Sequence, residues 1–319
     1  MPHAPPPDLA ALPKAELHIH LEGTTRPATR EEFAARTGVT IPRGFTDLNS
    51  FIESYLLSWQ TMTEPGDYAR LVREYCEDAA RSGIRYAELQ MAMIGRPYDQ
   101  LAEAVEEAQR QPDVVVRFII DVPRALPVEV GWAMLEKAKG IDDVVAIGLG
   151  GPEDGYPAGL FTELFAEAKR RGYKSAPHSG EDTGADAVQH TIDTLAPERI
   201  LHGVRSVEDE SVVKQLVDQN IALALCPTSN LLLGVTPTIE QHQLRELWDA
   251  GVTFSVNTDD PGFFDCDLTG EYAIAGRLLG LDRSGYAKLA RDSVETSFAP
   301  DELKEEMHAA IADWERAVT

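Results

Sequence analysis

Two histidines separated by one residue are the first candidates for chemistry in this sequence. His18 and His20 lie in the run ELHIHL at residues 16–21, whose alternation is typical of a β-strand. Alternate side chains of a strand share one face, so both imidazoles are predicted to point the same way. Two buried imidazoles with nothing between them lose hydrogen bonds when neutral and repel each other when charged. The spacing therefore favours a metal site, with two separately hydrogen-bonded core histidines as the alternative.

Further candidate ligands stand at the ends of later apolar runs. His178 lies in APHSGED, and Asp259 lies in NTDDP. Three imidazole nitrogens and one carboxylate oxygen are a donor set that suits Zn²⁺ and leaves a position for water. One zinc ion per chain is predicted, held by His18, His20, His178 and Asp259.

Two more residues could move protons beside such a metal. Glu181 is three residues beyond His178, close enough to handle a proton without being a ligand. A solvated loop carboxylate is the alternative for Glu181. His202 ends another apolar run, RILHGV, and is a second acid–base candidate, with an ordinary core histidine as its alternative.

Short apolar runs alternate with helix-like segments along the chain, and this rhythm predicts an α/β fold. Eight strand–helix units close a (β/α)8 TIM barrel, in which every strand ends at the same mouth, so ligands far apart in sequence can meet there. An open doubly wound sheet is the alternative, but no GxGxxG follows the first strand. We expect a single domain over residues 1–319, with strands at 16–21, 84–91, 114–122, 144–149, 173–178, 199–202, 221–225 and 252–257.

An unusually long segment, residues 24–83, separates the first strand from the second. Apolar residues recur at helical spacing in two parts of it, at 48–59 and at 67–82. The segment is therefore predicted to be a helical insertion. Because it follows the first strand, it should lie over the mouth where the active sites of barrels are found.

The amino-acid composition limits the classes of molecule that the protein could bind and the cellular compartment in which we expect it. The net charge of −24 opposes binding to nucleic acid or to anionic lipid but leaves small uncharged molecules open as substrates. Three widely spaced cysteines match no disulfide framework, which indicates a reducing compartment. No signal-peptide pattern or membrane-length apolar run is present. We expect a soluble cytoplasmic protein; the sequence leaves its oligomeric state open.

Five motifs, in this order and over nearly the whole chain, resemble those of the adenosine deaminase family. They are LPKAELHIHLEG at 12–23, HSGE at 178–181, ERILHGV at 198–204, CPTSN at 226–230 and NTDDP at 257–261. The resemblance implies a zinc-dependent hydrolase that removes the 6-amino group of a purine base or nucleoside. Its implied metal ligands are the four already named from their spacing.

The resemblance also implies roles around the substrate. Glu181 would protonate N1 of the purine, and His202 would orient and deprotonate the attacking water. Asp260 would hydrogen-bond the purine edge near N7, and the backbone N–H of Gly151 would approach N3. His20 would also border the bound base.

Three departures from the usual family motifs bear on the substrate. Leu201 precedes the histidine where glycine is common, and Ser179 replaces the more common alanine. The segment at 148–153 reads GLGGPE, whereas adenosine deaminases usually carry aspartate at the position of Gly148. This version looks more like the bacterial branch that includes aminodeoxyfutalosine deaminases. Aminodeoxyfutalosine, adenine and N6-substituted adenine are therefore alternative substrates to adenosine.

Two other function classes remain to be weighed. A two-metal amidohydrolase needs a bridging lysine at the end of the fourth strand, but no lysine stands there, and Lys174 opens the fifth strand. An inactive binding protein on the same scaffold is the non-enzyme alternative. The presence of every metal-binding and proton-transfer position argues against it.

Overall fold

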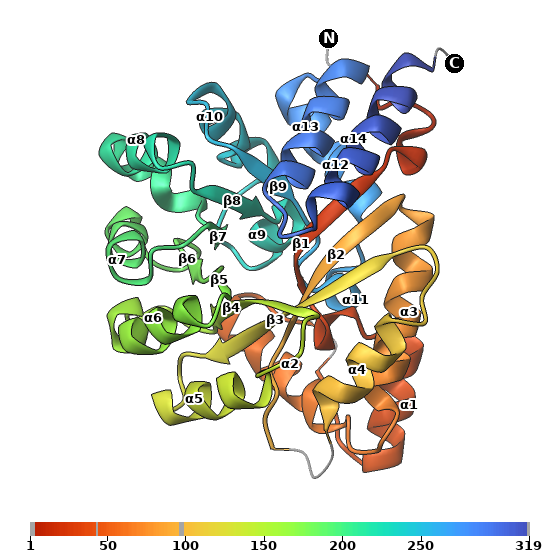
Figure 1. Cartoon of the computed structure of the whole chain (residues 1–319), viewed down its shortest axis with the longest axis vertical. Helices are drawn as coiled ribbons and strands as arrows, with labels where there is room; N and C mark the ends of the chain where they lie inside the picture. The colour runs from red at the N-terminus through yellow and green to blue at the C-terminus, as the bar shows by residue number, and fades with distance from the viewer. Residues whose placement is uncertain (1–3, 43, 96–98, 318–319) are drawn as a thin grey trace.

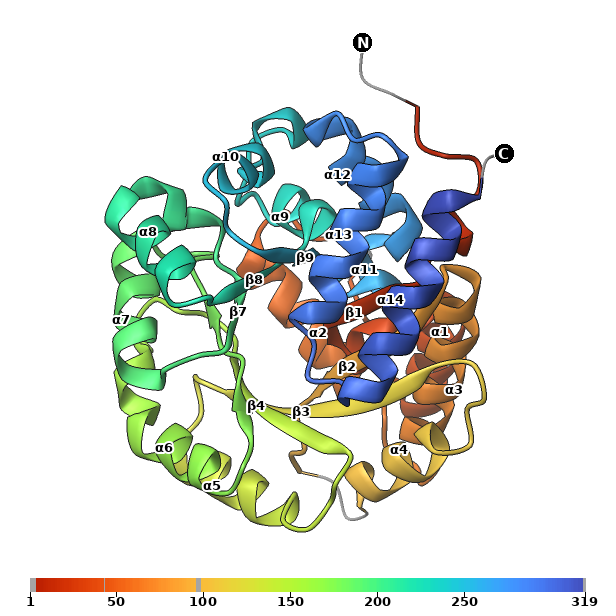
Figure 2. The same cartoon turned by 45° about the horizontal axis from the view of Figure 1, so that its top comes forward.

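The computed structural model, which describes residues 4–42, 44–95 and 99–317, forms a ring of parallel strands surrounded by helices (Figures 1 and 2). The predicted single domain also includes residues 1–3, 43, 96–98 and 318–319, which lie outside the described part; residue 43 falls within the predicted insertion. The strands are β1 (Lys14–His20), β2 (Ile84–Met91), β3 (Val115–Pro123), β4 (Val144–Gly150), β5 (Lys174–Ser175), β6 (His178–Ser179), β7 (Arg199–His202), β8 (Ala222–Leu225) and β9 (Phe254–Val256).

The strands follow the sequence order around the ring. Strands β1 to β5 form one parallel ladder and β6 to β9 form another. Backbone hydrogen bonds at Asp259, just beyond β9, close the ring: its N–H donates to His18 O (3.1 Å) and its carbonyl accepts from His20 N (2.9 Å). The predicted α/β fold class, a (β/α)8 barrel, is therefore confirmed.

One predicted strand, at 173–178, is present as two short pieces, β5 and β6. Pro177 lies between them and has no N–H to donate to a ladder. The neighbours still follow the barrel, because Ala176 N donates to Ile147 O (2.9 Å) and Leu201 N donates to Pro177 O (2.9 Å). The two pieces thus occupy the position of one barrel strand. The other predicted strands are present with ends shifted by no more than two residues.

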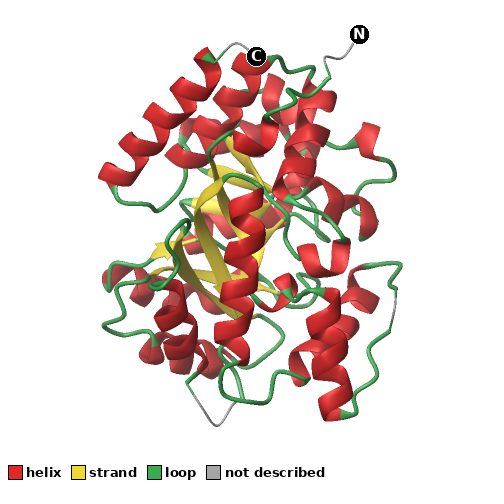
Figure 3. Cartoon of the chain, turned by 90° about the vertical axis from the view of Figure 1, so that its right-hand side faces the viewer, coloured by secondary structure: helices red, strands yellow, loops and turns green. Residues whose placement is uncertain are grey.

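Helices cover the outside of the strands (Figure 3). The main apolar core lies between the two layers and includes Leu17, Ile19 and Leu223 from the strands. Within the described residues, no helix is both long and apolar enough to cross a membrane. The helices are α1 (Pro27–Thr37), α2 (Leu48–Gln60), α3 (Asp67–Arg81), α4 (Gln100–Ala108), α5 (Val128–Lys137), α6 (Thr162–Arg170), α7 (Ala185–Leu195), α8 (Glu210–Asp218), α9 (Pro227–Leu232), α10 (Leu244–Asp249), α11 (Pro261–Phe264), α12 (Leu268–Leu279), α13 (Arg283–Glu295) and α14 (Asp301–Arg316).

The segment between β1 and β2 is helical, as predicted, and contains α1, α2 and α3. Asp47 starts α2 with a capping box, in which its carboxylate accepts from Ser50 N and Ser50 Oγ accepts from Asp47 N. Phe51 and Tyr55 of α2 pack beside Phe263 and Phe264 of α11, near the carboxyl end of β9. Helix α2 therefore lies at the mouth of the barrel.

A buried ion pair lies inside the amino-terminal part of the barrel. The guanidinium of Arg199, in β7, binds the carboxylate of Glu88, in β2, and both side chains are fully buried. Tyr86 Oη and Phe298 N also donate to Glu88, and the Arg199 guanidinium lies over the Phe298 ring. This network fills that end of the barrel with charges that neutralise each other.

Candidate active site

An irregularity in β1 sets the direction of its histidines. The register of β1 against β2 shifts between Glu16 and Ile19, so part of the regular ladder is lost. The Gln90 side chain replaces it, accepting from Ile19 N (2.6 Å) and donating to Leu17 O (3.3 Å). From the other side, Asn257 Oδ1 accepts from Leu17 N (2.8 Å). Buried amides thus hold β1 in place between β2 and β9.

Four side chains bring donor atoms together where these strands end; we call them the donor cluster: His18, His20, His178 and Asp259. Nε2 of His178 lies 3.2 Å from Nε2 of His18 and 3.2 Å from Nε2 of His20. Oδ1 of Asp259 lies 3.2 Å and 3.3 Å from the same two atoms. The structure thus brings together all four predicted ligands.

The other polar atoms of the donor cluster are occupied by the protein. Nδ1 of His18 faces Ala224 O (3.1 Å), and Nδ1 of His178 faces Leu149 O (3.1 Å). Nδ1 of His20 lies 3.6 Å from Oδ2 of Asp121. Ser229 Oγ donates to Oδ2 of Asp259 (2.7 Å). Because backbone carbonyls face Nδ1 of His18 and of His178, these two rings carry the proton on Nδ1 and present a lone pair at Nε2.

Four separations between donor atoms of the cluster are short enough for one metal ion to contact both atoms of each pair. Neighbouring ligands about 2.0–2.1 Å from a zinc ion lie roughly 3.3 Å apart. The four separations are 3.2, 3.2, 3.2 and 3.3 Å. Buried lone pairs this close repel each other unless a cation lies between them. The cluster is therefore able to bind a metal.

His202 enters the site from the end of β7 through a left-handed backbone, with a φ of 60°. Its Nε2 lies 3.5 Å from Oε2 of Glu181 and 3.8 Å from Oδ2 of Asp259. Asp259 is also left-handed, with a φ of 65°. Such backbone is strained for residues other than glycine and concentrates at functional sites. Burial lowers the pKa of His202 to about 3, with further lowering by His18.

Glu181 is almost completely buried beside His202. Burial raises its pKa well above the usual range, and the negative charges of Asp259 and Glu153 raise it further. A carboxyl group in such surroundings keeps its proton near neutral pH and can donate it. The geometry therefore suits the acid role predicted for Glu181.

A carboxylate that the sequence analysis did not single out holds the loop of Glu181. The side chain of Glu153 accepts from Gly180 N (2.9 Å), Glu181 N (2.9 Å) and Asp182 N (3.3 Å). Thr183 Oγ1 donates to the same carboxylate at 2.6 Å. Glu153 therefore fixes the loop between β6 and α7.

Arg124, which also escaped the sequence analysis, supports the neighbouring backbone. Its Nη2 donates to His178 O (2.6 Å), and its Nη1 lies 4.0 Å from Glu153. Arg124 and Glu153 come from loops after β3 and β4, and no periodic pattern links them. Only the GLGGPE segment pointed toward this region.

Asp260 is buried next to Asp259, at the start of α11. Its Oδ1 has no hydrogen-bond partner among the described residues, so it is free to form a hydrogen bond with a ligand. Burial and the adjacent Asp259 charge raise its pKa well above the usual range. A Cβ at Gly23 would lie 1.8 Å from Oδ1, so only glycine leaves room for this carboxyl group.

Asp121 explains why glycine occupies positions 148 and 150. A Cβ at Gly148 would lie 2.9 Å from Oδ1 of Asp121, and a Cβ at Gly150 would lie 2.4 Å from Oδ2. Asp121 in β3 thus fills the space beside β4 where a larger side chain could otherwise project, and its Oδ1 has no partner among the described residues. Gly151 follows β4 directly, is exposed and has a φ of 94°. Its contact with N3 stays a prediction.

The other two departures from the family motifs are buried. Ser179 is hydrogen-bonded to Thr191 (2.9 Å) on α7. Leu201 is fully buried, and alternation along β7 places it on the side of Arg199, inside the barrel.

The helical insertion contributes to the mouth. The ring of Tyr55 lies 6.2 Å from that of His20, and its hydroxyl donates to Glu22 (3.2 Å). Tyr68 of α3 donates to the same carboxylate at 3.3 Å. Burial raises the pKa of Glu22 to about 7. Glu22 and Tyr55 are thus additional polar groups near the donor cluster.

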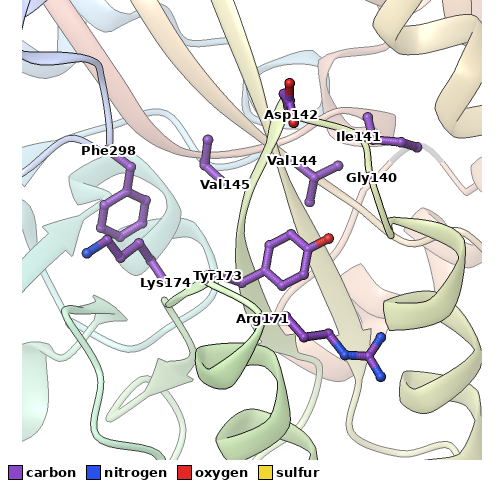
Figure 4. Close-up of a pocket in the computed structure, with 10 residues that line it drawn as sticks. Gly140, Ile141, Asp142, Val144, Val145, Arg171, Tyr173, Lys174 and Phe298 are labelled. Atoms are coloured by element: carbon purple, nitrogen blue, oxygen red, sulfur yellow. The ribbon is translucent and has the colours of Figure 1, made fainter.

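A different hollow opens at the amino-terminal ends of β4 and β5 (Figure 4). It has a volume of about 460 Å³ and is lined by Asp142, Arg171, Tyr173, Lys174 and Phe298 among others. Its lining contains no histidine or cysteine. The chemistry predicted from the sequence therefore gathers at the opposite end.

The chain is similar to several known deaminases over nearly its whole length. The chain is 38% identical to an aminodeoxyfutalosine deaminase of Streptomyces avermitilis, over 91% of this chain and 87% of that protein. It is 33% identical to an adenine deaminase of Cupriavidus necator, over 94% and 91%. The crystal structure of adenine deaminase from Arthrobacter aurescens superposes with a TM-score of 0.89 at 29% identity, covering 96% of this chain and 100% of that one. The sequence model of the adenosine deaminase family matches residues 13–314, and the chain belongs to that family.

Proposed function

We propose that this protein is a zinc-dependent hydrolase that converts a 6-aminopurine base or nucleoside into the 6-oxo product and ammonia. The observation that carries the proposal is the donor cluster with Glu181 and His202 directly beside it at one end of the barrel, all buried except the partly exposed His20. The named relatives act, by their names, on aminodeoxyfutalosine and on adenine, which are 6-aminopurines or derivatives of them.

Zinc is the metal we propose, at one ion per chain. Three imidazole nitrogens and one carboxylate oxygen are ligands typical of Zn²⁺, and separations of 3.2–3.3 Å between donor atoms of the cluster are those of neighbouring zinc ligands. When bound, the ion would supply a Lewis acid that lowers the pKa of the attacking water.

The side chains around the cluster have separate tasks. Glu181 gives its proton to N1 of the purine, which makes C6 more electrophilic. His202 orients the water that adds to C6. Because N7 is an acceptor, Asp260 binds the purine edge there by donating from its protonated carboxyl group, whose Oδ1 has no partner among the described residues. The backbone N–H of Gly151 faces N3, and His20 borders the base. The carbon–nitrogen bond at C6 then breaks, and ammonia leaves.

The substrate is a small molecule. The acidic composition does not favour nucleic acid, and the site is built from buried side chains rather than an exposed basic surface. The three cysteines are free thiols, which suits the reducing cytoplasm, and we place the protein there as one domain over residues 1–319.

Aminodeoxyfutalosine and adenine are the leading candidates within the 6-aminopurine class. Two observations favour them over adenosine: the relative with 38% identity carries the first name, and Asp121 with Gly148 replaces the aspartate that adenosine deaminases usually carry on the fourth strand.

Ammonia release from a panel of purines tests this proposal. The panel contains adenine, adenosine, deoxyadenosine, aminodeoxyfutalosine and N6-methyladenine, and each reaction is followed by ammonia detection and by the absorbance change of the purine. For N6-methyladenine, methylamine replaces ammonia as the product. We expect at least one member to give equal amounts of amine and 6-oxo product. If zinc-loaded protein converted no member, the proposed function would be wrong.

A further inference from the structure

His202 differs from the histidines of the donor cluster in the partner that its Nδ1 meets. In the cluster, Nδ1 of His18 and of His178 each faces a backbone carbonyl and therefore carries the ring proton. Nδ1 of His202 lies 3.2 Å from the side-chain nitrogen of Asn230, in α9. An amide nitrogen is a donor, so Nδ1 of His202 accepts a hydrogen bond.

The orientation of the Asn230 amide follows from a backbone group that cannot reverse. Leu244 N donates to Nδ1 of His242 at 3.1 Å, so this ring nitrogen carries no proton. In a neutral imidazole the proton then lies on Nε2, which is 3.1 Å from Oδ1 of Asn230. With its oxygen accepting from His242, Asn230 directs its N–H groups toward His202.

If the side-chain amide of Asn230 were turned over, two hydrogen-bond donors would face each other. Its nitrogen would then face the protonated Nε2 of His242, and both groups would lose their hydrogen bonds in a buried place. His202, Asn230 and His242 are each at least 96% buried. No water replaces a lost bond at such depth without a cavity, so the orientation is strongly preferred.

His202 and His242 each have an Nδ1 that accepts a hydrogen bond and so carries no proton. Burial also lowers the pKa of His242 to about 4. The ring proton of His202 therefore lies on Nε2, which points at the carboxyl groups of Glu181 (3.5 Å) and Asp259 (3.8 Å). Both of these groups contain oxygen acceptors, which agrees with a donor at Nε2.

We propose that His242 and Asn230 are positioning residues that fix His202 with its proton on Nε2, so that His202 donates a hydrogen bond to the attacking water. This assignment replaces the sequence-based prediction that His202 removes the proton of the water. The catalytic role of this hydrogen bond rests on the proposed deamination. The position of the proton on His202 is independent of the proposed function.

The proton balance then rests on Glu181. Its carboxyl proton goes to N1, and the resulting carboxylate accepts the first proton of the water as the oxygen–carbon bond forms at C6. The second water proton passes to the departing amino group as the carbon–nitrogen bond breaks, which yields ammonia and the 6-oxo purine. Both protons of the water are accounted for, and Glu181 ends protonated as it began.

Nitrogen NMR of the metal-loaded protein locates the proton directly. With ¹⁵N-labelled histidine, long-range proton–nitrogen correlations distinguish a protonated ring nitrogen from a bare one, and a His202→Gln sample identifies the signals of His202. In the unmodified protein we expect a proton on Nε2 of His202 and none on its Nδ1. A proton on Nδ1 of His202 would overturn the proposal, whatever the substrate turns out to be.

Two variants test whether Asn230 and His242 control the position of the proton on His202. Asp at position 230 offers only acceptors, so Asn230→Asp should move a proton onto Nδ1 of His202 and lower kcat by about 10²-fold or more, with little change in KM. His242→Gln keeps an N–H donor toward Asn230 and should retain most of the activity and the original proton position. If the Asn230→Asp variant folded and Nδ1 of His202 still carried no proton, Asn230 would not control the position of the proton on His202.

Discussion

The two ends of the barrel both bury charged side chains, but the charges are used differently. At the amino-terminal end, Glu88 and Arg199 neutralise each other, and Tyr86 and the backbone of Phe298 donate to the carboxylate. At the carboxyl-terminal end, the lone pairs of the donor cluster converge on one another, and Oδ1 of Asp260 has no partner among the described residues. Buried charges that satisfy each other indicate structure, whereas buried acceptors that face each other indicate a ligand.

Removing the carboxylate of Asp259 from the carboxyl-terminal end of the barrel should have the largest effect on activity. Asp259→Ala deletes one of the four donor atoms and leaves the bond from Ser229 unmade. We expect loss of both metal and activity, with the barrel still folded, when metal content and circular dichroism are measured together. A variant that held one metal per chain and turned over normally would contradict the ligand assignment.

Glu181→Gln separates proton transfer from metal binding at the same end. The amide cannot act as the acid, so turnover should fall by about 10²- to 10⁴-fold while the metal content stays unchanged. Stability should change little or rise, because the substitution removes a buried ionisable group. Near-normal turnover by this variant would show that another group protonates the substrate.

Glu88→Gln makes the same chemical change at the opposite end and should give the opposite result. It leaves Arg199 as an unpaired buried cation, which costs about 3–5 kcal/mol of unfolding free energy. Because the pair lies away from the donor cluster, kcat should stay within about twofold of the original below the melting transition. Denaturant unfolding and steady-state kinetics on both glutamine variants decide whether the two ends differ as described.

Glu153→Gln should have a smaller effect on turnover than Glu181→Gln. A glutamine oxygen can still accept from part of the loop, but its NH₂ group faces the backbone N–H groups of Gly180 and Glu181. We expect about a tenfold to hundredfold loss of kcat, retained metal and faster amide exchange of residues 180–182 in mass spectrometry. Unchanged exchange in that peptide would show that Glu153 does not hold the loop.

Much of the fold and the donor cluster was predictable because it rests on local patterns. His18 and His20 share a strand face by alternation, and His178 and Asp259 stand at strand ends that a barrel gathers at one mouth. The β5–β6 interruption follows from Pro177, which has no N–H to donate to a ladder.

The remaining features depend on contacts between segments that carry no common period. Glu153 meets the loop at 180–183, and Asn230 lies between His202 and His242, only because the register of the barrel brings these segments together. The ion pair of Glu88 and Arg199 likewise joins strands far apart in sequence. Backbone strain is a further reason, because the left-handed conformation of His202 breaks the alternation that placed its neighbours.

Zinc titration into metal-free protein, with ammonia release as the readout, tests the central claim most directly. The best substrate of the purine panel is used, and zinc is added in steps from zero to two equivalents per chain. Activity should be absent without metal, rise linearly and level off at about one equivalent. Full ammonia release from metal-free protein, or a plateau that requires two ions per chain, would contradict a single zinc ion held by His18, His20, His178 and Asp259.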